Sequence, residues 1–149
     1  MIIALTGHRS EDCRSEADVR TRVREALSTS PERVDAVICG MANGLDLWGG
    51  DEALGLGMEV WAAKPWTTHT ARKSDIELYA RIIASASRVI NVTESDTYPG
   101  PWVYHKRNEW MVDNASHVLA YWSGKEKGGT YACVNYARKV NRPIRNIYG

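Results

Sequence analysis

Short apolar runs alternate with longer amphipathic segments along the whole chain, and this alternation constrains the fold more than any other feature. Six runs are expected to form strands, at residues 2–5, 34–40, 59–63, 88–92, 117–122 and 143–148. Helices are expected between them: one opening at 15–18, one ending near 56, then 71–86, about 102–114, and a last one carrying Ala132, Tyr136 and Val140. Alternating strands and helices form βαβ units. We therefore predict an α/β fold, a single three-layer domain over residues 1–149, with a mainly parallel sheet of about six strands and helices on both faces.

Composition narrows the class of protein. The formal net charge is +1 with acids and bases interspersed, so no overall field attracts nucleic acid or an anionic membrane. No apolar run approaches the roughly 18 residues that cross a bilayer. Cys13, Cys39 and Cys133 form no paired motif, which favours a reducing compartment over a disulfide scaffold. We predict a cytoplasmic protein with no membrane contact, for which nucleic acid is not the expected partner.

A glycine-flanked turn, Gly40-Met41-Ala42-Asn43-Gly44, connects the second predicted strand to a helix. Both glycines permit backbone angles that a Cβ would block. Asn43 is expected to cap the helix, with Asp46 in the position that a capping box uses. Such a junction presents free N–H groups and a positive helix dipole, which suits phosphate. The alternative is an ordinary strand-to-helix turn.

Three polar, glycine-bearing segments follow predicted strands, at residues 6–9, 40–46 and 123–130. In parallel sheets, ligands bind at the carboxyl ends of the strands, where the winding reverses. If the first strand lies between the second and the fifth, all three segments converge on one crevice. This convergence predicts the position of the functional site.

The same motifs carry a family resemblance. Residues 6–9, 40–48, 104–113 and 122–124, with Gly128-Gly129-Thr130, resemble the YpsA-like proteins of the SLOG superfamily, a Rossmann-like group. That superfamily includes the Lonely Guy phosphoribohydrolases and the DNA-processing protein DprA. The resemblance implies a nucleotide or nucleotide-derived ligand in the crevice. The Lonely Guy signature has a catalytic Glu three residues after its final Gly-Thr, whereas this chain has Cys133, which argues against cytokinin-type phosphoribohydrolysis.

Several polar residues in these segments have two interpretations. Arg9 is suited to bidentate binding of a phosphate or to a surface ion pair. His8 is a candidate general acid or base, or a polar turn residue. Asp46 could accept from ribose hydroxyls or serve only as a helix cap. The 128–130 turn could hold a phosphate or only begin the last helix.

The aromatic composition is unusual, with six Trp, seven Tyr and no Phe, and the polar atoms of Trp and Tyr suit partly hydrated pockets and interfaces. Tyr104, Arg107, Asn108 and Met111 share one helix face, and their mixture predicts a crevice or subunit interface rather than core. Tyr104 or Trp66 could stack on a base, an interaction that contributes roughly 1–3 kcal/mol. Trp48 and Trp61 are expected in the core.

We hypothesise a sensor or sequestering protein that binds a nucleotide-derived small molecule, as a homo-oligomer. The alternatives are an N-glycosidic-bond hydrolase or transferase, with Asp46 or Glu109 as catalytic candidates, and a DprA-like single-stranded DNA binder. His8, His69, His105 and His117 are scattered, so we expect neither a metal nor a cofactor. The predicted ligand-binding residues are Gly7, His8, Arg9, Gly40, Met41, Ala42, Asn43, Gly44, Asp46, Lys64, Trp66, Tyr104, Arg107, Asn108, Gly124, Gly128, Gly129 and Thr130.

Overall fold

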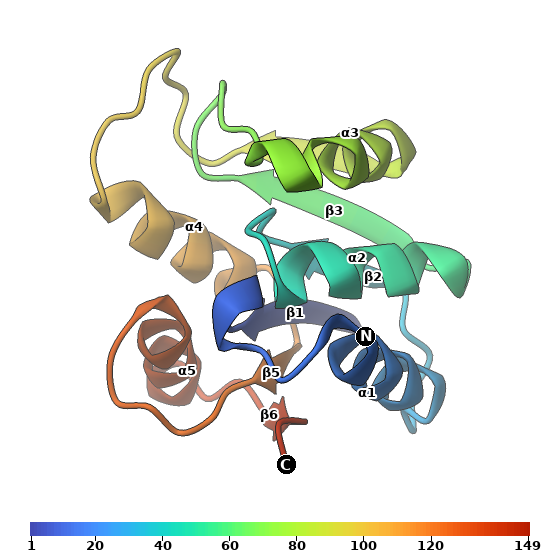
Figure 1. Ribbon diagram of the computed structural model, residues 1–149. Helices are drawn as coiled ribbons and strands as arrows, with labels where there is room; N and C mark the ends of the chain where they lie inside the picture. The colour runs from blue at the N-terminus through green and yellow to red at the C-terminus, as the bar shows by residue number, and fades with distance from the viewer.

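A computed structural model describes all 149 residues and contains a single six-stranded sheet (Figure 1). The strands are β1 (Ile2–Gly7), β2 (Ala36–Cys39), β3 (Glu59–Lys64), β4 (Arg88–Asn91), β5 (His117–Tyr121) and β6 (Ile144–Asn146). The helices are α1 (Glu16–Ser28), α2 (Leu45–Gly55), α3 (Ile76–Ser85), α4 (Trp102–Asp113) and α5 (Gly129–Lys139), with short 3₁₀ turns η1 (Ser10–Asp12) and η2 (Lys73–Asp75). None of the helices combines the length and apolarity needed to cross a membrane.

The sheet is parallel throughout, with the order β4-β3-β2-β1-β5-β6. Ala4 of β1 pairs in register with Ile38 of β2 on one side and Val118 of β5 on the other. The chain winds outward from β1 to β4 and then returns to the other side of β1. The winding therefore reverses between β1 and β5, which is the arrangement that brings the three predicted polar segments together.

Helices cover both faces, so the predicted three-layer α/β fold is confirmed. Helices α1, α2 and α3 lie on one face, against strand residues such as Leu5 and Val37, and α4 and α5 lie on the other, against Ala4 and Ile38 (Figure 1). This alternation along β1 and β2 follows from the two-residue period of a strand. Helix α2 packs closely against β1, since a Cβ at Gly49 would lie 2.9 Å from Leu5 Cδ1.

The structure corrects three local predictions. Helix α2 has Gly44 as its N-cap, with a φ of 86°, and no side chain caps it. Asn43 was expected there, but its Oδ1 instead accepts from the Ser10 N–H at 2.9 Å and fastens the loop after β1. Helix α3 begins at Ile76 rather than 71, because η2 and the loop before it occupy the preceding residues. Strand β6 covers Ile144–Asn146 rather than 143–148, because at its end the Asn146 side chain, not the backbone, pairs with the backbone of Trp122.

Candidate functional site

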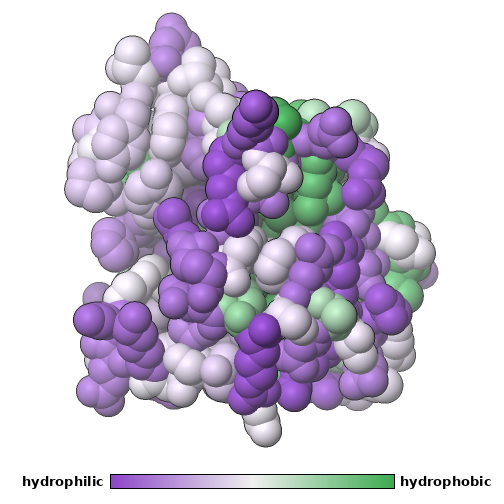
Figure 2. Space-filling view, viewed as in Figure 1, coloured by the Kyte–Doolittle hydropathy of each residue, from purple (hydrophilic) through white to green (hydrophobic).

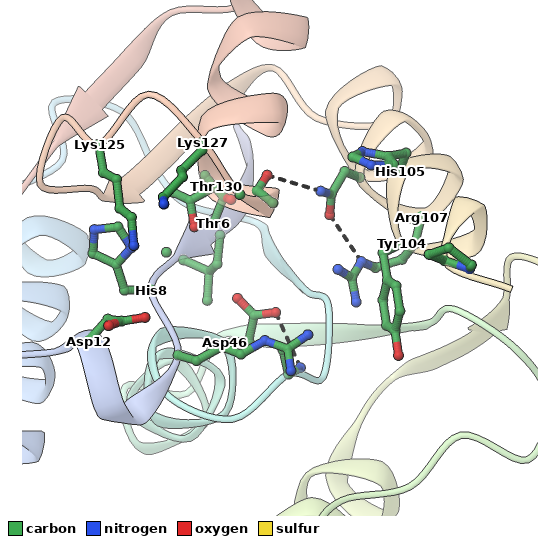
Figure 3. A pocket seen from close by; sticks show the side chains of 18 residues that line it. Thr6, His8, Asp12, Asp46, Tyr104, His105, Arg107, Lys125, Lys127 and Thr130 are labelled. Carbon is green, nitrogen blue, oxygen red and sulfur yellow. Dashed lines mark hydrogen bonds between the residues drawn. The ribbon is translucent and has the colours of Figure 1, made fainter. Parts of the chain in front are cut away.

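A cavity of about 490 Å³, the main cavity of the candidate site, lies at the carboxyl ends of the central strands, where the winding reverses (Figure 3). All three polar segments predicted from the sequence contribute to it, together with the first half of α4. Two arginines, two lysines, two histidines and two aspartates are among its lining residues. Its lining comprises Leu5, Thr6, Gly7, His8, Arg9, Asp12, Ala42, Asp46, Pro101, Tyr104, His105, Arg107, Asn108, Lys125, Lys127, Gly128, Gly129 and Thr130.

Asp46 is a buried carboxylate in this cavity, 7% exposed, in the first turn of α2. Its Oδ2 accepts from the Ala42 N–H at 3.2 Å, and a Cβ at residue 40 would lie 2.8 Å from the same oxygen, which explains Gly40. Burial raises the pKa of Asp46 to about 6, against the attraction of Arg107 and Arg9 and the Ala42 hydrogen bond. Near neutral pH this group can accept a hydrogen bond from a hydroxyl or exchange a proton.

Arg107 is a buried cation without a carboxylate partner. It is 7% exposed, and its hydrogen bonds go from Nη1 to the Gly40 carbonyl at 2.7 Å and from Nε to Asn108 Oδ1 at 3.1 Å. Neither acceptor is an anion, although Asp46 lies near enough for the two charges to interact. Burying a charge without a paired counter-charge costs several kcal/mol. An anionic ligand in the cavity would offset that cost.

The amino end of α5 is open to the cavity. Gly128 is the N-cap, with a φ of 95°, and no side chain caps the helix. The first-turn N–H groups are therefore free to bind an anion. Lys125 and Lys127 lie on the preceding loop and extend toward the cavity, opposite Arg107 and Tyr104 (Figure 3).

The 40–44 turn is more closed than the sequence suggested. The His8 carbonyl accepts from the Leu45 N–H at 3.2 Å, and a Cβ at Gly44 would lie 2.5 Å from that carbonyl oxygen. The loop after β1 thus packs directly over the start of α2. Of this turn and the first residues of α2, only Ala42 and Asp46 line the main cavity.

His8 holds the loop after β5. Its Nε2 accepts from the Ser123 N–H at 2.8 Å and lies 3.0 Å from the Ser123 hydroxyl, so the neutral ring carries its proton on Nδ1. Burial lowers the pKa of His8, with Asp12 raising it and Lys125 lowering it further. Because Nε2 is already occupied, this arrangement suits positioning of the loop better than proton transfer to a ligand.

The other predicted residues lie outside the main cavity. Met41, Asn43 and Trp66 line a second cavity beside it, whereas Lys64 Nζ donates to the Thr67 carbonyl at 2.6 Å. Glu109 is exposed and faces a shallow depression between α4 and α5. Gly124, with a φ of 95°, is an exposed loop residue.

The structure adds lining residues that are absent from the predicted ligand-binding set. Thr6, Lys125 and Lys127 lie within the predicted polar segments, whereas Leu5, Asp12, Pro101 and His105 lie outside them. Thr6 directly precedes Gly7 at the carboxyl end of β1, so its position at the cavity follows from the predicted convergence of the strand ends. Asp12 reaches the cavity through η1, which no periodicity predicts. No three His, Cys, Asp or Glu side chains come together in a way that could hold a metal ion.

Comparison with known proteins places the fold. No family model matches the chain. Over 71 residues it is 40% identical to the uncharacterized SPbeta prophage-derived protein YoqJ of Bacillus subtilis, a match that covers 42% of this chain and 41% of that relative. The chain thus matches less than half the length of this curated relative.

Solved structures resemble the whole chain. The DNA processing protein A of Streptococcus pneumoniae aligns with a TM-score of 0.74 and 16% identity, over 96% of this chain and 49% of that one. The Helicobacter pylori DNA processing protein A, described by its single-stranded DNA binding mode, aligns with a TM-score of 0.74 and 19% identity, over 97% of this chain and 63% of that one. A molybdenum cofactor binding protein from Rippkaea orientalis aligns with a TM-score of 0.63 and 16% identity, over 96% of this chain and 73% of that one. This chain shares their fold. At these identities, the likeness extends no further than the fold.

Proposed function

We propose that this protein binds a nucleotide or nucleotide-derived small molecule in the 490 Å³ cavity, as a sensor or sequestering protein. The observation that carries the proposal is Arg107, a buried guanidinium that has no ion-pair partner and faces the cavity. A phosphate would supply the missing counter-charge, and guanidinium geometry matches phosphate oxygens. The uncapped start of α5 lies on the same cavity and binds anions through its backbone.

The ligand's parts are assigned by chemistry. The phosphate is placed between Arg107 and the 128–130 turn, with Lys125 and Lys127 adding screened attraction from the loop. The ribose is placed over Asp46, whose buried carboxylate would accept from its hydroxyls. Arg9, which is exposed and has no ion-pair partner, is placed beside the ribose. The proposed membership of the YpsA-like group of the SLOG superfamily is supported by the motifs and by the likeness of fold.

A second candidate is an enzyme that cleaves an N-glycosidic bond. It is favoured by the pKa of Asp46, which burial raises to about 6, near the working pH of a general acid or base. Asp46 is preferred to Glu109, because Glu109 lies outside the main cavity. Asp46→Asn should then retain ligand but lose turnover, and chromatography of the bound ligand would distinguish intact nucleotide from base plus sugar phosphate.

A third candidate is single-stranded DNA binding, favoured by the likeness to the H. pylori protein. The basic groups of the cavity could contact backbone phosphates, although the net charge of +1 provides no extended basic surface. Binding of an oligothymidylate that weakens steeply with salt would support this candidate. Binding of a mononucleotide that an oligonucleotide does not displace would refute it.

The test of the leading proposal is calorimetric titration with AMP and ADP-ribose. Arg107→Met should lower the affinity for either by at least about tenfold, because it removes a desolvated phosphate contact. Lys106→Met is the matched control, since Lys106 is the adjacent, exposed residue of α4 and lies outside the cavity. The proposal fails if neither nucleotide binds, or if the two variants weaken binding equally.

A further inference from the structure

A second cavity of about 400 Å³ adjoins the first and has a different chemistry. The two cavities share Arg9, Ala42 and Tyr104, so they meet at these residues. The first is surrounded by basic groups and a helix amino end. The second is lined by aromatic, aliphatic, polar and charged residues: Arg9, Glu11, Met41, Ala42, Asn43, Trp66, His69, Thr70, Ala71, Arg72 and Tyr104.

An aromatic cluster forms one wall of the second cavity. The Trp66 ring centroid lies 4.8 Å from that of His69, 5.1 Å from Tyr98 and 6.0 Å from Tyr104, all edge-to-face. These residues come from the loop after β3, the loop after β4, and α4. The upper-left region of Figure 2, which carries these loops, is pale rather than strongly hydrophilic. Trp66 itself is only half-buried, so the cluster retains an open face.

The surroundings of His69 fix its tautomer and leave Nε2 as a hydrogen-bond acceptor. The Tyr79 hydroxyl donates its one proton to the His69 carbonyl at 2.7 Å, and the same oxygen lies 2.9 Å from His69 Nδ1. Nδ1 must therefore donate, which leaves Nε2 as a bare acceptor on the neutral ring. Burial lowers the pKa of His69 to about 4, helped by the positive charges of Arg107, Lys64 and Arg9. The ring is thus neutral at physiological pH.

No group of the chain donates to this acceptor. His69 lines the second cavity, and its only side-chain hydrogen bond is the one from Nδ1. An aromatic wall beside a fixed, unpartnered nitrogen acceptor matches a planar heterocycle that carries an amino group. Adenine and cytosine present such an amino group on their Watson–Crick edges, whereas hypoxanthine and uracil present a carbonyl in its place.

We propose that the second cavity is a nucleobase subsite that selects a base with an amino group at the position of adenine N6 or cytosine N4, by stacking near Trp66 and by a hydrogen bond from that amino group to His69 Nε2. This inference rests on the proposed function, since the phosphate and ribose of the same ligand occupy the first cavity. Arg9, Ala42 and Tyr104 then lie at the passage between sugar and base. The ligand is accordingly a 5′-nucleotide or a larger molecule that contains one.

The experiment compares three probes by calorimetry: ribose 5-phosphate, AMP and IMP. AMP should bind about 5- to 150-fold more tightly than ribose 5-phosphate, the factor that stacking of one base contributes. AMP should also bind at least about tenfold more tightly than IMP, whose carbonyl would face the lone pair of Nε2.

Two pairs of variants separate the contributions. Trp66→Leu should reduce the affinity for AMP toward that for ribose 5-phosphate and leave ribose 5-phosphate unchanged, which also shows that the variant is folded. Trp102→Leu is its control, because Trp102 is 49% exposed and lines neither cavity. His69→Asn keeps a donor near the position of Nδ1 but lacks Nε2, and should abolish the preference for AMP over IMP. His69→Gln, which can offer an oxygen near the position of Nε2, should retain part of it.

Each outcome has a defined meaning. If ribose 5-phosphate binds and AMP binds no better, the base subsite is refuted while the proposed function stands. The same holds if Trp66→Leu weakens both ligands equally. If AMP and IMP bind alike, the acceptor role of His69 is refuted. If none of the three probes binds, the proposed function and the subsite fail together.

Discussion

Replacing Asp46 by Asn should make the protein more stable, and the gain should depend on pH. The pKa of Asp46 rises from 3.8 in an unfolded chain to about 6 in the folded protein. A carboxyl whose folded pKa is raised stabilises the fold while protonated, and that stability is lost as the pH rises through the folded pKa. A shift of about two units corresponds to about 3 kcal/mol, lost between roughly pH 4 and pH 6. Asn is nearly isosteric, is neutral at every pH, and can still accept from the Ala42 N–H.

Urea unfolding of both proteins at pH 4.5 and pH 8 tests this reasoning. The free energy of unfolding of the variant should exceed that of the natural protein by about 1 kcal/mol at pH 4.5 and by about 3 kcal/mol at pH 8. At pH 4.5 the carboxyl is already ionised in the unfolded chain but still protonated in the folded protein, whereas at pH 8 it is ionised in both. Groups that titrate equally in both proteins cancel from the difference. A gain that is equal at the two pH values, or a loss at pH 8, would refute the assignment of a buried ionised carboxylate.

Asp51, on the same helix, is a control of opposite sign. Burial alone would raise its pKa, but hydrogen bonds from Arg81 and Arg20 outweigh burial and lower it. A depressed folded pKa contributes stability that is present above the unfolded pKa and lost as the pH falls. Asp51→Asn should therefore destabilise the protein at pH 8 and less so at pH 4.5, the reverse of the pattern at Asp46.

Two further predictions concern packing and charge. Gly7→Ala should destabilise the fold by about 1–3 kcal/mol in urea unfolding, because its Cβ would lie 2.5 Å from the buried Leu45 Cγ. Gly55→Ala, with no atom within 4 Å, should be neutral or stabilising by up to about 1 kcal/mol, and equal losses at both positions would contradict this packing. Lys125→Gln and Lys127→Gln should each weaken AMP binding by no more than about fivefold, since exposed ion pairs contribute about 0.2–1 kcal/mol. These losses should shrink in titrations at 1 M salt, and a salt-independent loss would show that the lysines act otherwise.

The sequence predicted the architecture well because periodicity reports burial. The six apolar runs all became strands, and Val19, Val23 and Leu27, spaced for a helix, are buried on α1. The convergence of the glycine-bearing turns required only that β1 lie between β2 and β5, which the observed strand order confirms. Local patterns thus suffice for the fold and for the place of the cavity.

Contacts between distant residues were beyond such patterns. Asn43 has the chemistry of a helix cap, but its side chain bonds Ser10, 33 residues away, and Gly44 caps instead. The pairing of His8 with Ser123 joins residues 115 apart. Spacing placed Arg107 on one helix face, but only the fold shows that it is buried without a carboxylate partner. The homo-oligomer and the cytoplasmic location stay predictions.

Helix α4 fastens both walls of the main cavity. From consecutive positions, Arg107 donates to the carbonyl of Gly40, after β2, and Asn108 donates to that of Gly129, at the start of α5. Gly40 follows a strand of the half of the sheet that winds from β1 to β4, and Gly129 lies in the connection between β5 and β6, in the other half. A ligand that draws Arg107 toward itself therefore pulls on both halves through a single turn of helix. The cavity is expected to tighten or relax as one unit, and ligand binding should slow amide exchange in the 40–44 and 128–130 turns together.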